Sequence, residues 1–325
     1  MTVKLPHSRP VSAHTREGYI QSSHGKIYYL DQGLPTAPPV VLIMGLACQL
    51  TMWPETLVQQ LLGEGFRVIR FDNRDVGLSD QASAGVRVSL PEVMLKSRLG
   101  LPVAVNYTLY DMVTDTIAVL DGLGIPKAHL VGVSMGGMIS QLTAAIFPQR
   151  VASLCSIMST TNERHLPLPR RDILMALNGW GLPKGHDKES AVKRSDVFWG
   201  LVSSPKIGES KEERLQQMAA NYDRSYRPAG VLRQTQAIAA TGGFGRLLSR
   251  VSCPTQVLHG DSDPLVHIKC GLDTAKRIRH SKFHAFKGMA HDFPPSLVPE
   301  IGYRITLNIA EALQRCGWGH AETHA

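Results

Sequence analysis

Short, almost uniformly apolar runs recur along the chain and alternate with longer segments in which apolar residues lie three to four positions apart. Uniform apolar runs indicate strands that are covered on both faces, and the wider spacing indicates amphipathic helices. The runs predict strands over residues 26–30, 40–44, 66–71, 128–133, 151–158, 255–259 and 282–286. Helices are predicted over 52–62, 109–123, 135–147, 267–278 and 297–313. This alternation predicts an α/β fold built on a mostly parallel sheet.

The alternation stops between residues 162 and 250, where helical pieces are separated by proline and glycine and no convincing strand is found. A segment of this length far exceeds the about 4–6 residues of an ordinary connection. We therefore expect a helical cap over 162–250, inserted between two strands of a core that comprises residues 18–161 and 251–315. Residues 1–17 and 316–325 are expected to be flexible tails.

The composition is that of an ordinary globular protein, with 43% hydrophobic and 19% charged residues among 325. The longest uncharged apolar run, residues 38–50, is shorter than the about 20 residues that span a membrane. The five cysteines are widely spaced and form no C-x-x-C pair, which argues against a disulfide framework or a zinc site. No apolar signal segment is found near the start. We expect a cytoplasmic protein without a membrane span, a metal or another cofactor.

The formal net charge of +8 is concentrated in the expected cap, which holds 15 Lys and Arg residues against 9 Asp and Glu residues. A basic surplus raises the possibility of a nucleic-acid partner. No recognition helix, RNP-like strand or zinc spacing accompanies it, so we expect no nucleic-acid binding. The excess of positive charge is most simply explained by a solvated helical surface. Alternatively, the mouth of the cap favours anionic or carbonyl-rich substrates, or it docks on an acidic surface.

The strongest chemical signal is the motif Gly132-Val133-Ser134-Met135-Gly136, which joins a predicted strand to a predicted helix. A serine at such a turn is exposed as a nucleophile in a strained backbone conformation. Gly132 and Gly136 are small enough to let strand and helix approach each other closely. The glycines form neither G-x-G-x-x-G nor a P-loop, so a dinucleotide or nucleotide site is not expected.

A serine hydroxyl needs a base within hydrogen-bond reach, and the base needs an acid that orients it. In strand–turn–helix serine sites the chain order is serine, acid, histidine. His291 follows the last predicted strand in a loop that can reach Ser134, and we predict it to be the base. The other late histidines are less suited, because they lie in a helix, in a strand or near the end: His267, His280, His284, His320 and His324.

The predicted acid lies in the turn Asp261-Ser262-Asp263-Pro264, which follows the strand 255–259. Asp263 lies deeper in the turn and is preferred, whereas Asp261 is typical of a turn-stabilising residue. Glu163, which follows the strand 151–158, is a minor alternative.

Hydrolysis through a tetrahedral intermediate also requires two hydrogen-bond donors for the oxyanion. One is the backbone N–H of Met135, directly after the serine, and the other comes from the loop after an earlier strand. That loop is residues 44–47, in which Gly45 permits a sharp turn and the N–H of Leu46 is the expected donor.

Taken together, these segments resemble the α/β-hydrolase-fold serine hydrolases, and among them the esterases related to aclacinomycin methylesterase and to cofactor-free haloperoxidases. The resemblance covers about residues 18–315. It is carried by the turn 44–46, the segment 71–79, the serine motif, the Asp263 and His291 segments, and cap residues 222–225, 227–230 and 233–234. It implies an eight-stranded, mostly parallel sheet with the cap after the sixth strand, a Ser134–Asp263–His291 triad and no cofactor.

The chain departs from this family at two places. Many relatives have His-Gly where this chain has Met44-Gly45, which removes a side-chain donor but keeps the backbone donors. Asp75 stands where many relatives have glycine. We interpret residues 72–79 as a buried, hydrogen-bonded turn beside the oxyanion loop.

The predicted function is hydrolysis of a carboxylic ester of a small to medium organic substrate through an acyl-enzyme on Ser134. The same triad also serves carbon–carbon bond hydrolysis of a dienoic diketone or perhydrolysis, and a non-catalytic ligand-binding protein of the same fold is a further alternative. The substrate pocket is expected under the cap. The candidates for the lining of this pocket, unless they form the cap's own core, are Trp180, Phe198, Trp199 and Tyr222.

The oligomeric state, monomer or homodimer, is left open.

Overall fold

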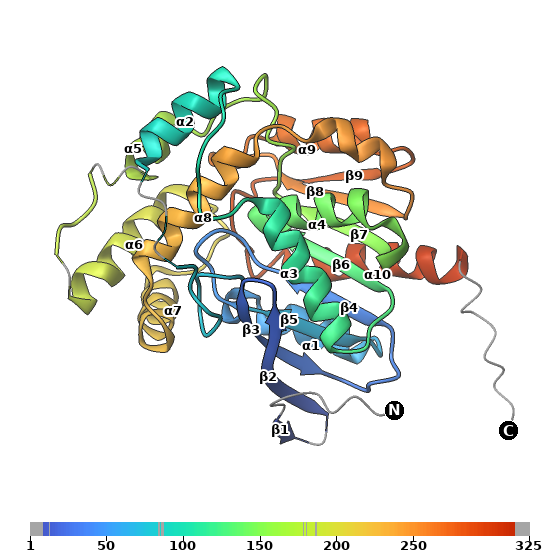
Figure 1. Ribbon diagram of the computed structural model, residues 1–325. Coiled ribbons are helices and arrows are strands. Elements are labelled where there is room, and N and C mark those ends of the chain that lie inside the picture. The colour runs from blue at the N-terminus through green and yellow to red at the C-terminus, as the bar shows by residue number, and fades with distance from the viewer. Residues whose placement is uncertain are drawn as a thin grey trace, which may run out of the picture.

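The computed structural model describes residues 9–12, 14–83, 85, 88–177, 179, 181–185 and 187–315. The strands in this part of the chain form one sheet in the order β1-β2-β3-β5-β4-β6-β7-β8-β9 (Figure 1). They are β1 (Arg9–Ser12), β2 (Thr15–Ser22), β3 (Gly25–Gln32), β4 (Pro39–Ile43), β5 (Arg67–Phe71), β6 (Ala128–Val133), β7 (Val151–Ile157), β8 (Thr255–Gly260) and β9 (Lys282–Phe286). The strands β5, β4, β6, β7, β8 and β9 run parallel to one another. The pairs β1–β2, β2–β3 and β3–β5 are antiparallel. The predicted mostly parallel sheet is confirmed.

The central strands are apolar along their whole length because helices cover both faces of the sheet. Every residue of β5, β6 and β8 is buried. Helices α3 and α4 contribute to the hydrophobic cluster on one face, and α1 and α10 contribute to the cluster on the other. The helices of the core are α1 (Glu55–Gly63), α3 (Leu109–Gly122), α4 (Met135–Ile146), α9 (Ile268–Arg277) and α10 (Val298–Arg315). Short 3-10 helices lie at η1 (Leu50–Met52), η2 (Pro148–Arg150) and η3 (Gly245–Arg250).

The N-terminal edge of the sheet corrects the sequence analysis. Residues 1–17 were expected to be a flexible tail, but Arg9–Ser12 and Thr15–Ser22 form strands, and β2 pairs with β3 along its whole length. The pattern of β2 alternates between buried and more exposed residues, so it lacks the uniform apolar run that identified the other strands. Beyond β1 the sheet has the eight expected strands, and the cap follows the sixth of these, β7. The other expected tail, residues 316–325, lies outside the described residues.

The described residues of the segment 162–250 contain helices and no strand, as predicted for a cap. The cap helices are α5 (Arg171–Leu177), α6 (Lys188–Val202), α7 (Lys211–Arg224) and α8 (Pro228–Thr241). A further helix, α2 (Leu90–Leu99), comes from the segment between β5 and α3 and packs against α8 (Figure 1). The cover over the carboxyl end of the sheet is therefore built from two separate parts of the chain.

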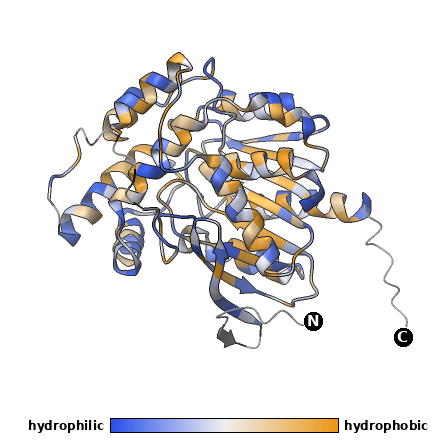
Figure 2. Ribbon diagram, viewed as in Figure 1, coloured by the Kyte–Doolittle hydropathy of each residue, from blue (hydrophilic) through white to orange (hydrophobic). Residues whose placement is uncertain are grey.

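The distribution of hydropathy follows these layers. Apolar residues concentrate on the strands and on the helices that flank them, whereas the cap helices mix polar and apolar positions (Figure 2). Within the described residues, no helix combines the length and the apolar character needed to cross a bilayer.

Candidate active site

Ser134 occupies the turn between β6 and α4, as the motif predicted. Its backbone has φ 54 and ψ −119, a conformation that an L-residue adopts only under strain. Hydrogen bonds on both sides stabilise this conformation: the N–H of Ser134 donates to the carbonyl of Ile157 at 2.9 Å, and its own carbonyl accepts the hydroxyl of Ser159 at 2.7 Å. This turn conformation therefore places the serine hydroxyl at the carboxyl edge of the sheet, directly after β6.

Gly132 and Gly136 lie where the strand and the helix are in direct backbone contact. A Cβ at Gly132 would lie 2.2 Å from the carbonyl oxygen of Gly136, and a Cβ at Gly136 would lie 2.0 Å from the carbonyl oxygen of Ile43. Neither position has room for a side chain. The two glycines are thus required by the close approach of β6, α4 and β4.

We expect Gly136→Ala to lower the free energy of unfolding by about 3 kcal/mol, because the methyl group forces backbone apart in a packed core. Gly63→Ala is the matched control, since nothing lies within 4 Å of a Cβ at that helical position. The control should be neutral or stabilising by about 0.5–1 kcal/mol. Urea denaturation of both variants measures the difference, and equal stabilities would contradict the packing described for the turn.

The structure brings Ser134, His291 and Asp263 into one chain of hydrogen bonds. Nε2 of His291 lies 3.0 Å from the hydroxyl oxygen of Ser134, and Nδ1 lies 2.7 Å from Oδ2 of Asp263. A carboxylate only accepts, so the proton of the imidazole resides on Nδ1 and leaves Nε2 free to accept the serine proton. Both His291 and Asp263 are buried.

Asp263 is held by its other oxygen. Oδ1 accepts the backbone N–H groups of Leu265 at 2.9 Å and Val266 at 2.8 Å, in the turn that follows β8. The carboxylate therefore has a fixed orientation, with Oδ2 directed at the histidine. This contact distinguishes it from Asp261, whose Oδ1 accepts the hydroxyl of Ser262 and the N–H of Gly288 and so acts within the turn.

The remaining candidates for base and acid have other partners. Glu163 accepts the N–H of Gly245, His267 accepts the N–H of Lys269 at the start of α9, and His284 pairs with Glu300. His280 is an exposed residue with positive φ beyond α9, and His320 and His324 lie outside the described residues.

A second histidine, which the sequence did not identify, lies near the acid. His259 is fully buried in β8, with Nε2 3.6 Å from Oδ2 of Asp263 and 2.7 Å from the carbonyl oxygen of Val266, to which it donates. Burial lowers the pKa of His259 and so favours the neutral ring, whose bond to the Val266 carbonyl stabilises the Asp263 turn. Its position at the end of a predicted strand gave no sign of this contact.

The His291 loop is fixed from the cap side. The N–H of His291 donates to the carbonyl of Val202 in α6 at 2.9 Å. Asp292 accepts the N–H and the hydroxyl of Ser204, and the hydroxyl oxygen of Ser204 accepts the N–H of Ala290 at 2.8 Å. Burial raises the pKa of the Asp292 carboxyl. The cap thus contacts the histidine loop directly.

The predicted oxyanion donors lie on either side of the serine. A Cβ built on Gly45 would be 3.2 Å from Cβ of Ser134, which places the turn 44–47 against the serine. Within the described part of the chain, the N–H groups of Leu46 and Met135 have no protein acceptor. The carbonyl of Met44 accepts the side-chain amide of Asn73 at 2.9 Å, so the turn is anchored, while the Met44 side chain is buried in the core.

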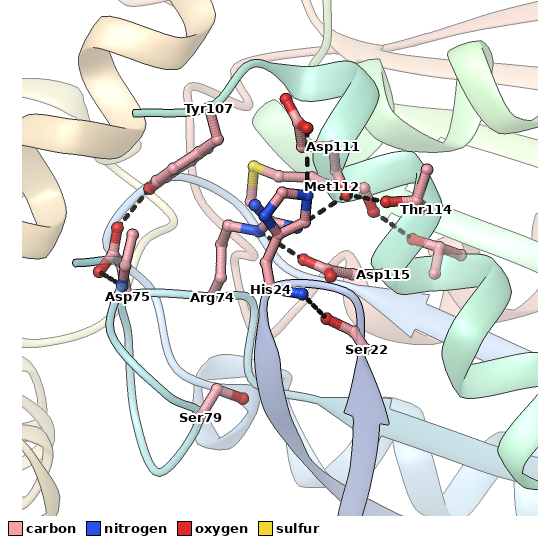
Figure 3. Close-up of polar contacts among 12 residues, drawn as sticks. Ser22, His24, Arg74, Asp75, Ser79, Tyr107, Asp111, Met112, Thr114 and Asp115 are labelled. Atoms are coloured by element: carbon pink, nitrogen blue, oxygen red, sulfur yellow. Dashed lines mark hydrogen bonds and ion pairs between the residues drawn. The ribbon is translucent and has the colours of Figure 1, made fainter. Parts of the chain in front are cut away.

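The segment 72–79 is the buried, hydrogen-bonded turn expected beside this loop (Figure 3). The guanidinium of Arg74 pairs with Asp115 of α3 at 2.6 Å, and the hydroxyl of Tyr107 donates to Asp75 at 2.6 Å. Burial raises the pKa of Tyr107, which keeps this hydroxyl a donor. Asp75 has φ 74, a left-handed conformation that explains why glycine suits this position.

A cavity of about 1040 Å³ opens over the serine. Ser134 and His291 form part of its wall, and most of the other lining side chains are apolar. Methionine is frequent among them, at Met44, Met52, Met94, Met135, Met138, Met158 and Met218.

Two of the four predicted pocket aromatics line this cavity, Phe198 and Trp199 of α6. Tyr222 is not among the lining residues, and its ring stacks on Tyr226 with centroids 4.6 Å apart. Trp180 lies outside the described residues.

Three of the cap's arginines bind the turn 72–79, two of them through aspartates. Arg224 lies 2.8 Å from Asp72, and the guanidinium of Arg233 contacts Asp75 with Nε at 2.9 Å. Arg227 donates to the carbonyl of Ser79. Part of the positive surplus of the cap is thus used to attach it to the turn 72–79.

The chain is similar to known hydrolases in sequence. Residues 38–294 match the family described as the alpha/beta hydrolase fold. Rhodomycin D methylesterase DnrP of Streptomyces peucetius is 24% identical over 281 residues, which cover 81% of this chain and 87% of that protein. A 2-hydroxy-6-oxononadienedioate/2-hydroxy-6-oxononatrienedioate hydrolase of Paraburkholderia phymatum is 27% identical over 271 residues. These cover 82% of this chain and 84% of that protein.

Among solved structures, the meta-cleavage product hydrolase CumD of Pseudomonas fluorescens IP01 superposes with a TM-score of 0.68 at 18% identity, over 90% of this chain and 97% of that one. The esterase RhEst1 of Rhodococcus sp. ECU1013 superposes with a TM-score of 0.64 at 21% identity, over 90% of this chain and 98% of that one. At these identities the likeness concerns the fold.

Proposed function

The chain belongs to the α/β-hydrolase fold family, and we propose that it is a serine esterase in which Ser134 is the nucleophile, His291 the general base and Asp263 the orienting acid. The observation that carries the proposal is the hydrogen-bond chain from Ser134 through Nε2 and Nδ1 of His291 to Asp263, at the wall of a large cavity. Ester hydrolysis is also the activity in the name of the methylesterase relative.

The proposed reaction begins when Ser134 Oγ attacks the ester carbonyl while Nε2 of His291 takes the hydroxyl proton. The resulting imidazolium is stabilised by Asp263 through the 2.7 Å contact at Nδ1. His291 then returns the proton to the departing alkoxide, which leaves as the alcohol. A water molecule, deprotonated by His291, attacks the acyl-enzyme, and the acid product leaves as Ser134 recovers its proton.

The charge that develops on the carbonyl oxygen is stabilised by the N–H groups of Leu46 and Met135 in this proposal. Both are unpaired within the described part of the chain, and the first belongs to a turn packed against Ser134. Fixed donors of this kind stabilise the transition state without the reorganisation that water requires. The Met135 N–H lies at the first turn of α4, where the helix dipole also favours negative charge.

The apolar cavity supports an ester with a sizeable apolar group. Its volume of about 1040 Å³ exceeds what a short acyl chain fills, and each buried methylene contributes about 0.8 kcal/mol. We expect kcat/KM for p-nitrophenyl esters to rise about tenfold or more from acetate to octanoate. Steady-state rates corrected for the Ser134→Ala background measure this, and a flat or falling series would contradict an apolar acyl site.

A second candidate function is hydrolysis of a carbon–carbon bond. It is favoured by the relative from Paraburkholderia phymatum, whose name states a hydroxy-oxo-dienedioate as the compound that is hydrolysed. The same three residues would serve it. A dienoic diketone assayed beside the ester panel separates the two: turnover of the ester without the diketone supports the esterase, and the reverse supports the alternative.

We further propose that the protein acts on a small-molecule ester in the cytoplasm without a nucleic-acid partner, as a monomer or a homodimer. The cysteines within the described residues are free. One of them, Cys48, is half-buried and lies at the cavity, and burial raises the pKa of its thiol to about 12.

A further inference from the structure

Gln234 of cap helix α8 reaches out of the cap to the oxyanion turn. Its side chain is fully buried. Oε1 accepts the backbone N–H of Ala47 at 2.9 Å, and Nε2 donates to the backbone carbonyl of Arg74 at 2.8 Å. We propose that Gln234 is a positioning residue for the oxyanion turn, acting through Ala47 on the N–H of Leu46. The inference rests on the proposed function, because it assigns a role to the Leu46 donor.

The turn needs such support because its backbone is strained at Ala47, whereas its anchor to Asn73 lies at the other end, on the carbonyl of Met44. Ala47 has φ 64, a left-handed conformation that costs a residue with a side chain about 1 kcal/mol or more. The N–H of Ala47 belongs to the peptide group that follows Leu46. Fixing that peptide group restricts the backbone of Leu46, and so the direction of its own N–H. Within the turn itself, the N–H of Cys48 donates to the carbonyl of Gly45 at 3.3 Å, a long bond that constrains Leu46 weakly.

The other end of Gln234 is attached to a rigid part of the core. The guanidinium of Arg74 donates to Asp115 and, at 2.9 Å, to the carbonyl of Asp111, and it lies over the ring of Tyr107 at 4.9 Å (Figure 3). Asp75, the next residue, is held by Tyr107 and by Arg233, the neighbour of Gln234. The amide thus links a fixed carbonyl to the oxyanion turn, and the ion pair beside it holds α8 in register.

A merely structural glutamine would stabilise the cap without affecting the chemical step. Loss of a whole oxyanion donor costs about a hundred- to a thousandfold in kcat. A donor that is kept but badly directed should cost less, and the effect should fall on kcat because the oxyanion exists only in the transition state and the intermediate.

The experiment compares Gln234→Met with Gln236→Met in the purified full-length enzyme. Gln236 lies on the same helix, is also buried, and donates to the carbonyl of Val88 at 2.6 Å, away from the oxyanion turn. We expect Gln234→Met to lower kcat about ten- to a hundredfold with KM within about twofold, and Gln236→Met to keep kcat within twofold. Equal effects of the two variants on kcat, with similar melting temperatures, would overturn the proposal.

Gln234→Glu provides a second test, which also applies if the methionine variant does not fold. At this fully buried position the carboxyl is expected to be neutral, so one oxygen still accepts the Ala47 N–H and the O–H donates to the backbone carbonyl of Arg74. It should retain most of the wild-type kcat, and a loss of tenfold or more in a folded Gln234→Glu protein would overturn the proposal. Absence of ester turnover by the wild type would instead count against the proposed function.

Discussion

Replacing Ser134 by alanine is expected to lower kcat for ester hydrolysis by about a millionfold while the protein keeps its fold. The hydroxyl oxygen of Ser134 lies 3.0 Å from Nε2 of His291, and no other group in the proposed mechanism can form the acyl-enzyme. The loss should appear in kcat, because Ser134 supplies the bond-forming atom and little of the substrate-binding surface. Initial rates with a p-nitrophenyl ester measure this loss, at enzyme concentrations high enough to detect the residual activity of the variant.

Ser140→Ala is the matched control for this experiment. Ser140 lies in α4, the helix that directly follows Ser134, and is buried, but its hydroxyl donates to the carbonyl of Gly136 at 2.8 Å and does not line the cavity. Its removal should leave kcat within about twofold. A Ser134→Ala enzyme that retained more than about 1% of the activity would exclude the serine as nucleophile.

Asp263→Asn is expected to lower kcat about ten-thousandfold, although the substitution is isosteric. Oδ1 of Asp263 accepts two backbone N–H groups, from Leu265 and Val266, so asparagine keeps its carbonyl oxygen there and turns its NH₂ toward His291. That NH₂ can only donate, so Nδ1 must become the acceptor and the imidazole proton moves to Nε2. Nε2 can then no longer accept the proton of Ser134.

The control for this variant is Asp261→Asn in the same turn. Asp261 contacts Ser262 and Gly288 but not the histidine, so the change should reduce stability slightly and leave kcat within about threefold. Stopped-flow or steady-state rates at neutral pH compare the two variants. A larger loss in Asp261→Asn than in Asp263→Asn would show that the acid has been misassigned.

Much of the fold could be predicted because the parallel strands are covered on both faces. Burial of every residue in β6 and β8 requires the uniform apolar runs that the sequence shows. β2 escaped prediction because it alternates, as a strand with one more exposed face does. α2 escaped prediction because its apolar residues are spread around the helix rather than gathered on one face, and only Val93 among them is fully buried.

The core of the candidate site could be predicted from local chemistry. Ser134 requires a recognisable strand–turn–helix motif, and chain order then restricts the acid and the histidine to a few candidates. Gln234 had no such local signal as a positioning residue, because its contact with Ala47 joins positions 187 residues apart. The contact of His259 with the Asp263 turn depends in the same way on how the strand is buried.

The pocket residues show the same limit. Phe198 and Trp199 line the cavity while Tyr222, on the next helix, stacks on Tyr226 instead. Which face of a cap helix is turned to the substrate depends on the packing of α6 against α7, and aromatic composition alone does not determine it. The charge of the cap likewise acquires a meaning only in the structure, where Arg224 and Arg233 pair with Asp72 and Asp75.

The central claim is that Ser134 is the nucleophile of an ester hydrolase, and covalent labelling tests it most directly. The wild-type enzyme, treated with a fluorophosphonate and digested, should carry one adduct on Ser134, formed at the rate at which ester hydrolysis is lost. The Ser134→Ala enzyme should carry none. Full inactivation with the adduct on another residue, or no labelling of an enzyme that hydrolyses esters, would contradict the account.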